Sequence, residues 1–268
     1  MGIRQPKTVS CMKNLLIGHC LTLKNFAAVR KGLGALPELE HLVIYQCDAL
    51  TSMASEFWYL TSLKQLKISG CKELDLSKNG SHNTCNSDLA SWISLGPFQN
   101  LTPIGIQQNP WSSLKNLRHL SLNEIPKMNA LPQGLTDVQS LKSLWISMCN
   151  ALEELPESIS NLMVLQYLRI VSCPALKRLP DGIKKVRSLI KVEIYDCTEL
   201  MERCREHTGE DWHKIKQARI LLHKSWRYGL MSDLRAAKKG MHFISGYLTM
   251  PNTWIIFMLH VNIVNCDC

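Results

Sequence analysis

A phrase of twelve residues occurs three times in the second half of the chain, at a constant spacing of 24 residues. It reads LKSLWISMCNAL from Leu141, LQYLRIVSCPAL from Leu165 and LIKVEIYDCTEL from Leu189. A fixed period of this length means that each copy folds into the same small unit, which cannot bury its apolar side chains without its neighbours. The chain is therefore expected to fold as a stack of units and not as a globule with one closed core.

The same frame extends toward the N-terminus, with further units beginning at Met12, Leu39, Leu63 and Leu117. An aliphatic residue recurs at the fourth position of each unit: Leu15, Leu42, Leu66, Leu120, Leu144, Leu168 and Val192. Another recurs at the sixth position: Ile17, Ile44, Ile68, Leu122, Ile146, Ile170 and Ile194. The form L-x-x-L-x-I-x-x-C is the signature of leucine-rich repeats, and the frame predicts about seven to eight of them.

Within one unit the residues alternate in the manner of a half-buried strand. Leu168 and Ile170 point to one side, and Tyr167, Arg169 and Val171 point to the other. Apolar residues at spacings of four and three, as in 155–162, predict a short helical turn before the next strand. The expected fold is an α/β leucine-rich repeat solenoid, curved, with parallel strands on its concave face and short helical or irregular segments on its convex side.

Six of the eleven cysteines share the ninth position of the unit: Cys20, Cys47, Cys71, Cys149, Cys173 and Cys197. In that register they are expected to stack as small buried side chains with inert, reduced thiols. The alternative is a disulfide or metal framework, but the chain has no C-x-x-C pair. Residues 1–10 are polar and basic and do not resemble a secretory signal. We therefore expect no metal, no cofactor and a reducing, cytoplasmic location.

The formal net charge of +9 bears on the partners of the chain. Acidic residues are interspersed throughout and no run of Lys or Arg exceeds two residues, which indicates a mixed-charge surface and not a nucleic-acid site. The basic balance favours acidic partners in a salt-dependent way. The apolar stretch 254–264 is too short for a membrane helix. Neither nucleic acid nor a membrane is an expected partner.

The repeat register divides the chain into three parts. Residues 1–200 are expected to form the solenoid, residues 201–220 a C-terminal cap, and residues 221–268 a poorly ordered tail. An irregular insertion rich in Asn, Ser, Gly and Pro interrupts the solenoid at about 77–110. Because the units on its two sides begin 54 residues apart, the alternative is that the insertion contains one degenerate repeat around 89–95.

Two motifs are more specific than the repeat. The phrase CPALKRLP at 173–180 has a weaker copy, CNALEELP, at 149–156, and the segment GEDWHKI at 209–215 closes the pattern. Together they resemble the C-terminal leucine-rich repeat domain of plant nucleotide-binding disease-resistance proteins, the intracellular immune receptors. The resemblance implies a non-catalytic module that recognises a pathogen effector or a host protein and restrains the nucleotide-binding switch domain of its receptor. No phosphate-loop motif occurs in this sequence, so nucleotide binding is not expected.

Two other functions are alternatives to this one. The first is the substrate-recognition repeat domain of an F-box-type ubiquitin-ligase adaptor, whose repeats also contain cysteines but usually lack the Leu-Pro phrase. The second is an enzyme, which is disfavoured because His41 and His119 share one column with no nucleophile or carboxylate beside them. Protein recognition without catalysis remains the prediction.

The strand residues that do not enter the core are expected on the concave face, which solenoids use for binding. Trp145 lies one strand from Tyr167 and Arg169, and aromatic residues beside arginine are typical of interface hot spots. The predicted protein-binding residues are Tyr45, Arg118, Lys142, Trp145, Tyr167, Arg169 and Tyr195. The alternative is that Trp145 and Arg169 form only a surface cation–π pair.

Overall fold

The computed structural model describes the greater part of the repeat region. The described residues are 12–24, 36–52, 60–76, 110–132, 134–224, 242–244, 247–249 and 255–257. The insertion expected at about 77–110 lies outside them except for its last residue, as does most of the expected tail.

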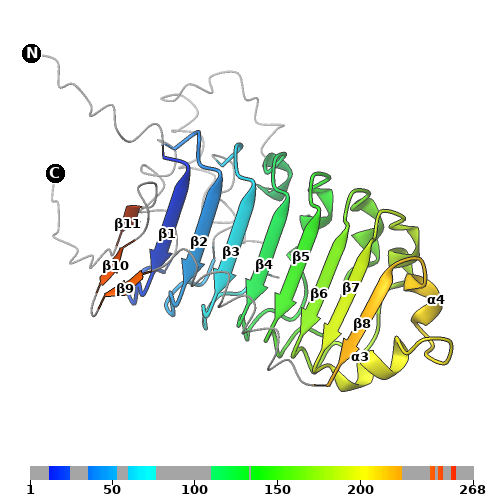
Figure 1. Cartoon of the computed structure of the whole chain (residues 1–268). Helices are drawn as coiled ribbons and strands as arrows, with labels where there is room; N and C mark the ends of the chain where they lie inside the picture. Colours follow the sequence, from blue (N-terminus) through cyan, green and yellow to red (C-terminus); the bar gives the residue numbers. More distant parts are fainter. Residues whose placement is uncertain are drawn as a thin grey trace, which may run out of the picture.

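Eight five-residue strands lie side by side in one open parallel sheet, in the order of the sequence (Figure 1). The strands are β1 (Asn14–Gly18), β2 (His41–Tyr45), β3 (Gln65–Ser69), β4 (His119–Asn123), β5 (Ser143–Ser147), β6 (Tyr167–Val171), β7 (Lys191–Tyr195) and β8 (Arg219–His223). Pairing joins residues of the same repeat position, such as Leu144 with Leu168 and Ile146 with Ile170. The predicted frame is therefore the register of the sheet.

The core lies against one face of this sheet. All the fourth-position and sixth-position side chains of β1 to β7 are buried, and so are Leu39, Leu63, Leu117, Leu141, Leu165 and Leu189, which open the units. Stacked in parallel strands, these residues form continuous apolar columns, and each repeat covers the apolar side of its neighbour. The chain folds as a leucine-rich repeat solenoid.

Each of the first seven strands ends in a turn whose first residue has a positive φ. These residues are His19, Gln46, Gly70, Glu124, Met148, Ser172 and Asp196. The backbone amide of each donates a hydrogen bond to the last carbonyl of the next strand, as from Gln46 to Ser69 at 2.9 Å. The left-handed bend directs the following residue into the core, where it is a cysteine in every repeat except the one with Ile125.

Short 3-10 helices run beside one another away from the strands: η4 (Pro110–Ser113), η5 (Leu135–Asp137), η6 (Glu157–Asn161) and η7 (Asp181–Lys185). They bury Ile159 and Ile183 toward the core. The carboxylate of Glu157 accepts hydrogen bonds from the amides of Asp181 and Gly182, which ties η6 to the first turn of η7. The prediction of a short helical turn in each of these repeats is confirmed.

Strands β3 and β4 are direct neighbours although the insertion separates them in the sequence. Gln65 pairs with His119, and the amide of Gly70 donates to the carbonyl of Asn123 at 3.0 Å. A degenerate repeat around 89–95 would have to place its strand between them. The paired backbones leave no room for a strand between β3 and β4, and residues 89–95 themselves lie outside the described residues.

The C-terminal end of the solenoid is closed by α3 (Thr198–Arg203) and α4 (Trp212–Ile215), with α4 packed against η7. Strand β8 follows them and pairs in parallel with β7, so that Ile220 stands opposite Val192 and Leu222 opposite Ile194. The sheet thus continues across the expected boundary between residues 220 and 221. Ile220 and Leu222 extend the two aliphatic columns of the core by one more strand.

Three further short strands lie in the expected tail. β9 (His242–Ile244) and β10 (Tyr247–Thr249) form an antiparallel pair, and β11 (Ile255–Phe257) pairs in parallel with β1 at the other edge of the main sheet. In the part of the chain that the structure describes, every helix is too short or too polar to cross a membrane.

Candidate functional site

The candidate site is the face of the sheet that points away from the core, which we call the open face. It carries the third and fifth residues of the units: Asn14, Leu16, His41, Val43, Gln65, Lys67, His119, Ser121, Ser143, Trp145, Tyr167, Arg169, Lys191 and Glu193. All of them are partly or fully exposed except Ser143, which is small and lies between His119 and Tyr167 in its column. The predicted division of the strands between the two faces is confirmed for these positions, whereas Val171, expected on the exposed side of β6, is buried.

An arginine held between two aromatic rings is the central feature of this face. The guanidinium carbon of Arg169 lies 5.4 Å from the ring centroid of Trp145 and 5.4 Å from that of Tyr195. Its Nε also lies 3.6 Å from a carboxylate oxygen of Glu193 in β7. Trp145 and its neighbour Tyr167 each remain 41% exposed. We call Trp145, Tyr167, Arg169 and Tyr195 the aromatic–arginine cluster.

The cluster has features of both alternatives considered for these residues, an interface hot spot and a surface cation–π pair. The cation–π pair of Trp145 and Arg169 is present, and it leaves part of the Trp145 ring available for contact. Because its four side chains stand on three adjacent, hydrogen-bonded strands, β5, β6 and β7, the cluster has little freedom to rearrange when a partner binds. Rigid aromatic and arginine side chains of this kind give large contact area at a small cost in conformational entropy.

Strand β8 supports the far side of the cluster. The rings of Tyr195 and His223 stack with centroids 5.4 Å apart and planes inclined by 13°. The hydroxyl of Tyr195 lies 3.4 Å from Glu193, and burial together with this carboxylate raises the pKa of Tyr195. The contact with His223 could not be predicted from the sequence, because β8 was not expected to join the sheet.

A hollow of about 490 Å³ opens beside the cluster on the open face. Its lining comes from strands β3 to β7: Gln65, His119, Ser143, Trp145, Tyr167, Leu168, Arg169, Lys191 and Glu193. Lys191 and Arg169 both contact the carboxylate of Glu193, so the charges at one end of the hollow are paired. The rest of the lining is aromatic or neutral, which suits an apolar side chain.

The remaining predicted residues do not all join the cluster. Tyr45 lies in β2, which β3 and β4 separate from β5, and its ring packs edge-on against His19 with centroids 4.8 Å apart. Arg118 and Lys142 are exposed at the positions just before β4 and β5. They stand at the edge of the open face next to the hollow, whereas Tyr45 belongs to a different part of the face.

Two histidines occupy the column next to that edge. Nδ1 of His41 lies within hydrogen-bond distance of the Asn14 side-chain oxygen, at 2.7 Å. The pKa of His119 is lowered by burial and by the positive charges of Arg118 and Lys142, with a smaller effect of His41. His119 is therefore neutral at pH 7 and is a candidate contact residue.

The described thiols of the core are buried, and the pKa of each is raised except that of Cys71, which a hydrogen bond with Cys47 lowers. Seven described cysteines, the six of the repeat register and Cys204, are free and buried. Several donate to the carbonyl two residues earlier, as Cys173 does to Val171. Burial raises the pKa of Cys149 and Cys197 to about 11, so both are protonated at pH 7. Among the described residues no group of three His, Cys, Asp or Glu side chains could hold a metal ion.

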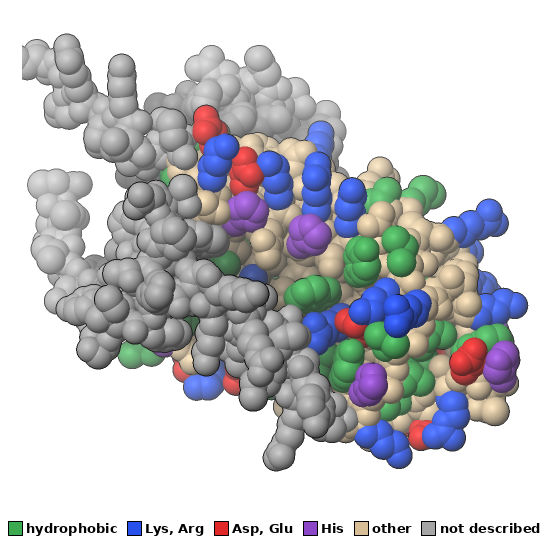
Figure 2. All heavy atoms as spheres, in the orientation of Figure 1, with side chains coloured by type: hydrophobic (Ala, Val, Ile, Leu, Met, Phe, Trp, Pro, Cys, Tyr) green, Lys and Arg blue, Asp and Glu red, His purple; other side chains and the backbone are tan. Residues whose placement is uncertain are grey.

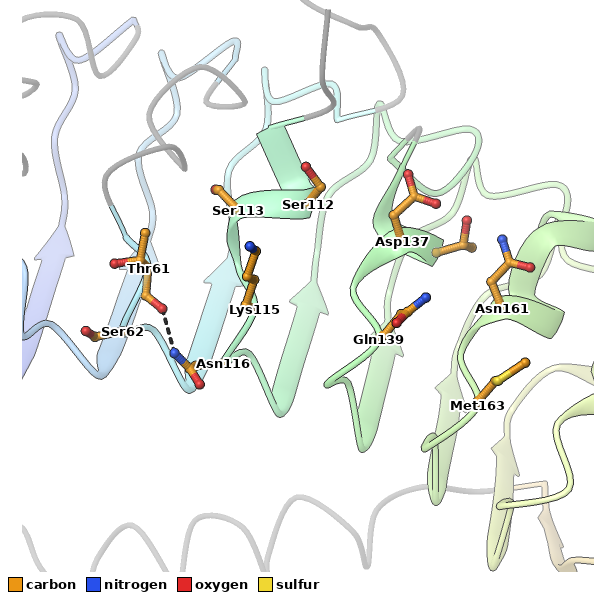
Figure 3. Close-up of a pocket in the computed structure, with 11 residues that line it drawn as sticks. Thr61, Ser62, Ser112, Ser113, Lys115, Asn116, Asp137, Gln139, Asn161 and Met163 are labelled. Atoms are coloured by element: carbon orange, nitrogen blue, oxygen red, sulfur yellow. Dashed lines mark hydrogen bonds between the residues drawn. The ribbon is translucent and has the colours of Figure 1, made fainter. Parts of the chain in front are cut away.

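A second hollow, of about 870 Å³, lies along the turns that precede β3 to β6 (Figure 3). It is lined by Thr61, Ser62, Ser112, Ser113, Lys115, Asn116, Thr136, Asp137, Gln139, Asn161 and Met163. The side chain of Asn116 donates to the carbonyl of Thr61 at 2.9 Å. The lining combines hydroxyl, amide and charged side chains and contains no histidine or cysteine among the described residues.

Comparisons with known proteins agree with the fold at a low level of similarity. A scan against protein-family models gives no match, and neither does a comparison with curated proteins. The leucine-rich repeat domain of the type III effector XopL is 19% identical, with 82% of this chain and 77% of that chain covered and a TM-score of 0.45. Internalin C2 from Listeria monocytogenes is 15% identical, with 80% and 78% covered and a TM-score of 0.35.

A leucine-rich repeat protein of Leptospira interrogans is also similar, with 17% identity, a TM-score of 0.26, and 71% of this chain and 56% of that chain covered. At these scores the similarity carries no argument about function. The fold assignment depends instead on the strand register and on the buried aliphatic columns of this chain.

Proposed function

We propose that this chain is a non-catalytic protein-recognition module that binds its partner through the open face of the sheet. The observation that carries the proposal is the arginine of β6 fixed between Trp145 and Tyr195, beside a hollow that exposes Tyr167. Aromatic rings and arginine in a rigid, partly desolvated setting supply most of the binding energy in protein interfaces. The reactive groups weigh against catalysis: burial raises the pKa of Cys149 and Cys197, so these thiols are protonated at neutral pH, and on the described open face His119 makes no hydrogen bond to Ser143 beside it.

We further propose that the module belongs to a plant intracellular immune receptor. Its partner would be a pathogen effector or a host protein, and it would restrain the nucleotide-binding domain of the same receptor, in the cytoplasm. The support comes from the sequence, in the Cys-Pro phrase at 173–180 and the closing segment at 209–215. The closing segment forms α4 and packs on the last 3-10 helix, as expected of a terminal cap.

The test is a two-hybrid screen of the full chain against libraries of plant proteins and of effectors, followed by binding measurements with purified partners. Trp145→Ala combined with Arg169→Glu should abolish the interaction and leave the circular dichroism melt unchanged. The matched control is Met163→Ala with Arg178→Glu, which makes the same change in charge at two exposed residues away from the open face. A partner that binds the first variant as well as the wild type would refute the open-face assignment.

The receptor assignment has a separate test. Co-expression of this chain with the nucleotide-binding domain encoded upstream in the same transcript should suppress signalling by that domain. If the transcript encodes an F-box upstream, or if the chain captures a Skp-type adaptor, the ubiquitin-ligase alternative replaces the receptor. Neither result decides whether the partner binds the open face, which is tested by Trp145→Ala with Arg169→Glu.

A further inference from the structure

The open face carries an excess of positive charge. In the eight strands β1 to β8 the acidic residue is Glu193, whereas the cations are Lys67, Arg169, Lys191 and Arg219. Glu193 is engaged by Lys191 and Arg169, so its charge is neutralised within the cluster. No described carboxylate on these strands balances Lys67. An uncompensated field of this kind attracts negatively charged partners.

A row of cations continues this charge along one edge of the face. Lys64, Arg118 and Lys142 occupy the same repeat position immediately before β3, β4 and β5, and we call them the basic rim. Adjacent strands are about 4.8 Å apart, so the three side chains lie in one line. Figure 2 shows Lys and Arg side chains in a row along this edge, with hydrophobic side chains lower on the same face.

The rim is only partly neutralised by the chain itself. Nζ of Lys64 contacts the Glu40 carboxylate at 2.7 Å. Within the described part of the chain, the structure gives the side chains of Arg118 and Lys142 no carboxylate within ion-pair distance. Both side chains are exposed, and a backbone hydrogen bond from the Lys142 amide to the Arg118 carbonyl, at 2.8 Å, keeps their main chains side by side. They form a pair of cations with the backbone spacing of consecutive strands.

His119 responds to the charge of the rim. It stands on the open face directly after Arg118, with Lys142 on the β5 side, Lys64 on the β3 side and His41 beyond it in β2. Its pKa is lowered, first by burial and then by Arg118, Lys142 and His41. This shift has the sign that a locally positive potential produces. Carboxylates placed on the rim would oppose it and favour the protonated form.

The rim and the hollow are continuous. His119 and Ser143, which line the hollow, are the residues that follow Arg118 and Lys142 in the sequence. A chain lying across the strands can therefore contact the rim with one side chain and the Trp145 and Tyr167 rings with another. The distance spanned is that of a few strand spacings, within reach of a short extended segment.

We propose that the open face binds an acidic, extended segment of a partner protein, with its carboxylates on the basic rim and an apolar side chain in the hollow beside Trp145 and Tyr167. The proposal rests on the proposed function and specifies the chemistry of the partner. Paired cations and exposed aromatic rings complement an Asp- or Glu-rich sequence that also contains an aromatic or aliphatic residue.

The experiment is a selection of random 12-residue peptides on phage against the full chain, followed by fluorescence titration of the selected peptides. The expected result is enrichment of Asp and Glu close to one apolar residue. Arg118→Ser with Lys142→Ser should weaken binding at least about tenfold and reduce its dependence on salt. Arg178→Ser with Lys184→Ser, which removes the same charge from exposed positions elsewhere, should leave the affinity unchanged.

Proton uptake gives an independent measurement on the same peptides. Since a bound carboxylate raises the lowered pKa of His119, the affinity should increase as the pH falls from about 8 to about 5.5. His119→Gln should remove most of this increase. A binding constant that stays independent of pH in the wild-type chain would show that no carboxylate lies near the rim and would overturn the proposal.

Other outcomes are also decisive. Selection of no peptides, or of peptides without acidic residues, overturns the inference. If such peptides nevertheless lose binding with Trp145→Ala, the proposed function stands and the acidic partner alone is wrong. If binding resists both Trp145→Ala with Arg169→Glu and the rim variant, both proposals fail. Equal binding of an oligothymidylate of the same charge would identify a polyanion site and overturn the assignment to a protein segment.

Discussion

The carboxylate of Asp211 accepts a hydrogen bond from the backbone amide of Leu179, at 2.9 Å, across 32 positions of the chain. Nζ of Lys214 donates to the carbonyl of the same Leu179 at 2.7 Å. Two side chains of the closing segment therefore satisfy both backbone groups of a buried residue where the stack of 3-10 turns ends. This contact gives a physical role to the motif that closes the repeat pattern.

Asp211→Ala should lower the free energy of unfolding by about 1–3 kcal/mol, because it leaves the buried Leu179 amide without an acceptor. Lys214 loses one carboxylate partner but keeps Asp181 and the Leu179 carbonyl. Asp211 is only 1% exposed and also accepts from Arg203. Urea unfolding followed by circular dichroism measures the change. Glu210→Gln, at the exposed neighbouring position, is the control and should have little effect; a similar loss in both variants would contradict the role of Asp211.

The same carboxylate predicts a dependence of stability on pH. Burial tends to raise the pKa of Asp211, but hydrogen bonds from Arg203, Leu179 and Lys214 outweigh it, so that the pKa is lowered overall. The stabilisation is therefore present at neutral pH and is lost as the pH falls below about 4 and through the folded-state pKa. Thermal melts between about pH 7 and pH 3 should show a steeper loss for the wild type than for Asp211→Asn. Parallel curves would contradict the prediction.

The repeat period was sufficient to predict the strands, the two faces and the register, because every fourth-position and sixth-position side chain has the same apolar environment. It was not sufficient at the C-terminal end. Gln217 stands where the other units open with Met or Leu, so β8 could not be recognised although Ile220 and Leu222 continue the columns. Likewise, the length of the insertion could not show whether it added a strand between β3 and β4.

In the candidate site, the contacts that could be predicted from the sequence are those between residues at the same repeat position on adjacent strands. Trp145 and Arg169 occupy the same position in adjacent units, so their contact could be expected from the sequence. Tyr45 was among the predicted binding residues because it is aromatic. It lies in β2, which β3 and β4 separate from Trp145 in β5. The engagement of Arg169 by Glu193 could not be foreseen, because the charges of neighbouring strands allow more than one pairing.

A pair of adjacent residues tests the division of a strand between its faces. Ile68 in β3 is 0% exposed, whereas Lys67 beside it is exposed on the open face. Ile68→Asp should destabilise the fold by more than about 4 kcal/mol, because it places an unpaired charge in the apolar column. Lys67→Asp should melt like the wild type. Equal melting temperatures of the two variants would be incompatible with this strand orientation.

The left-handed turns predict a residue-specific effect at Gly70. Its φ is +67°, a conformation that costs a β-branched residue about 1–2 kcal/mol but that asparagine adopts more readily. Gly70→Val should therefore lower the free energy of unfolding by about 2 kcal/mol, and Gly70→Asn by less than half of that. The other six turns use His, Gln, Glu, Met, Ser and Asp, so the sequence alone did not reveal this conformation. Denaturant titration of the two variants provides the comparison, and equal losses would contradict it.

At Gly182 the constraint is steric, because the backbone of Glu157 leaves no room for a side chain. A Cβ atom at this position would lie 2.0 Å from the carbonyl oxygen of Glu157, so Gly182→Ala must push η7 away from η6. The hydrogen bond from the Gly182 amide to the Glu157 carboxylate, at 2.6 Å, would be lost with it. We expect a loss of about 1–3 kcal/mol in the free energy of unfolding, measured in urea. Lys184→Ala, two residues later on the exposed side of the same helix, is the control; if Gly182→Ala is as stable as this control, the two 3-10 helices are not packed as closely as described.

The buried thiols predict a pattern of chemical reactivity. Because Cys149 has a pKa of about 11 and lies in the core, it should resist alkylation by iodoacetamide in the folded chain at about pH 8 and react fully after unfolding in urea. Cys197 should behave in the same way. Mass spectrometry of tryptic peptides measures both sites separately. Val192→Ala, which creates a cavity next to the column without changing a thiol, should speed alkylation of Cys197 through more frequent opening of the last repeats. Rapid alkylation of either cysteine in the wild-type fold would show that the ninth position of the repeat is not closed to solvent.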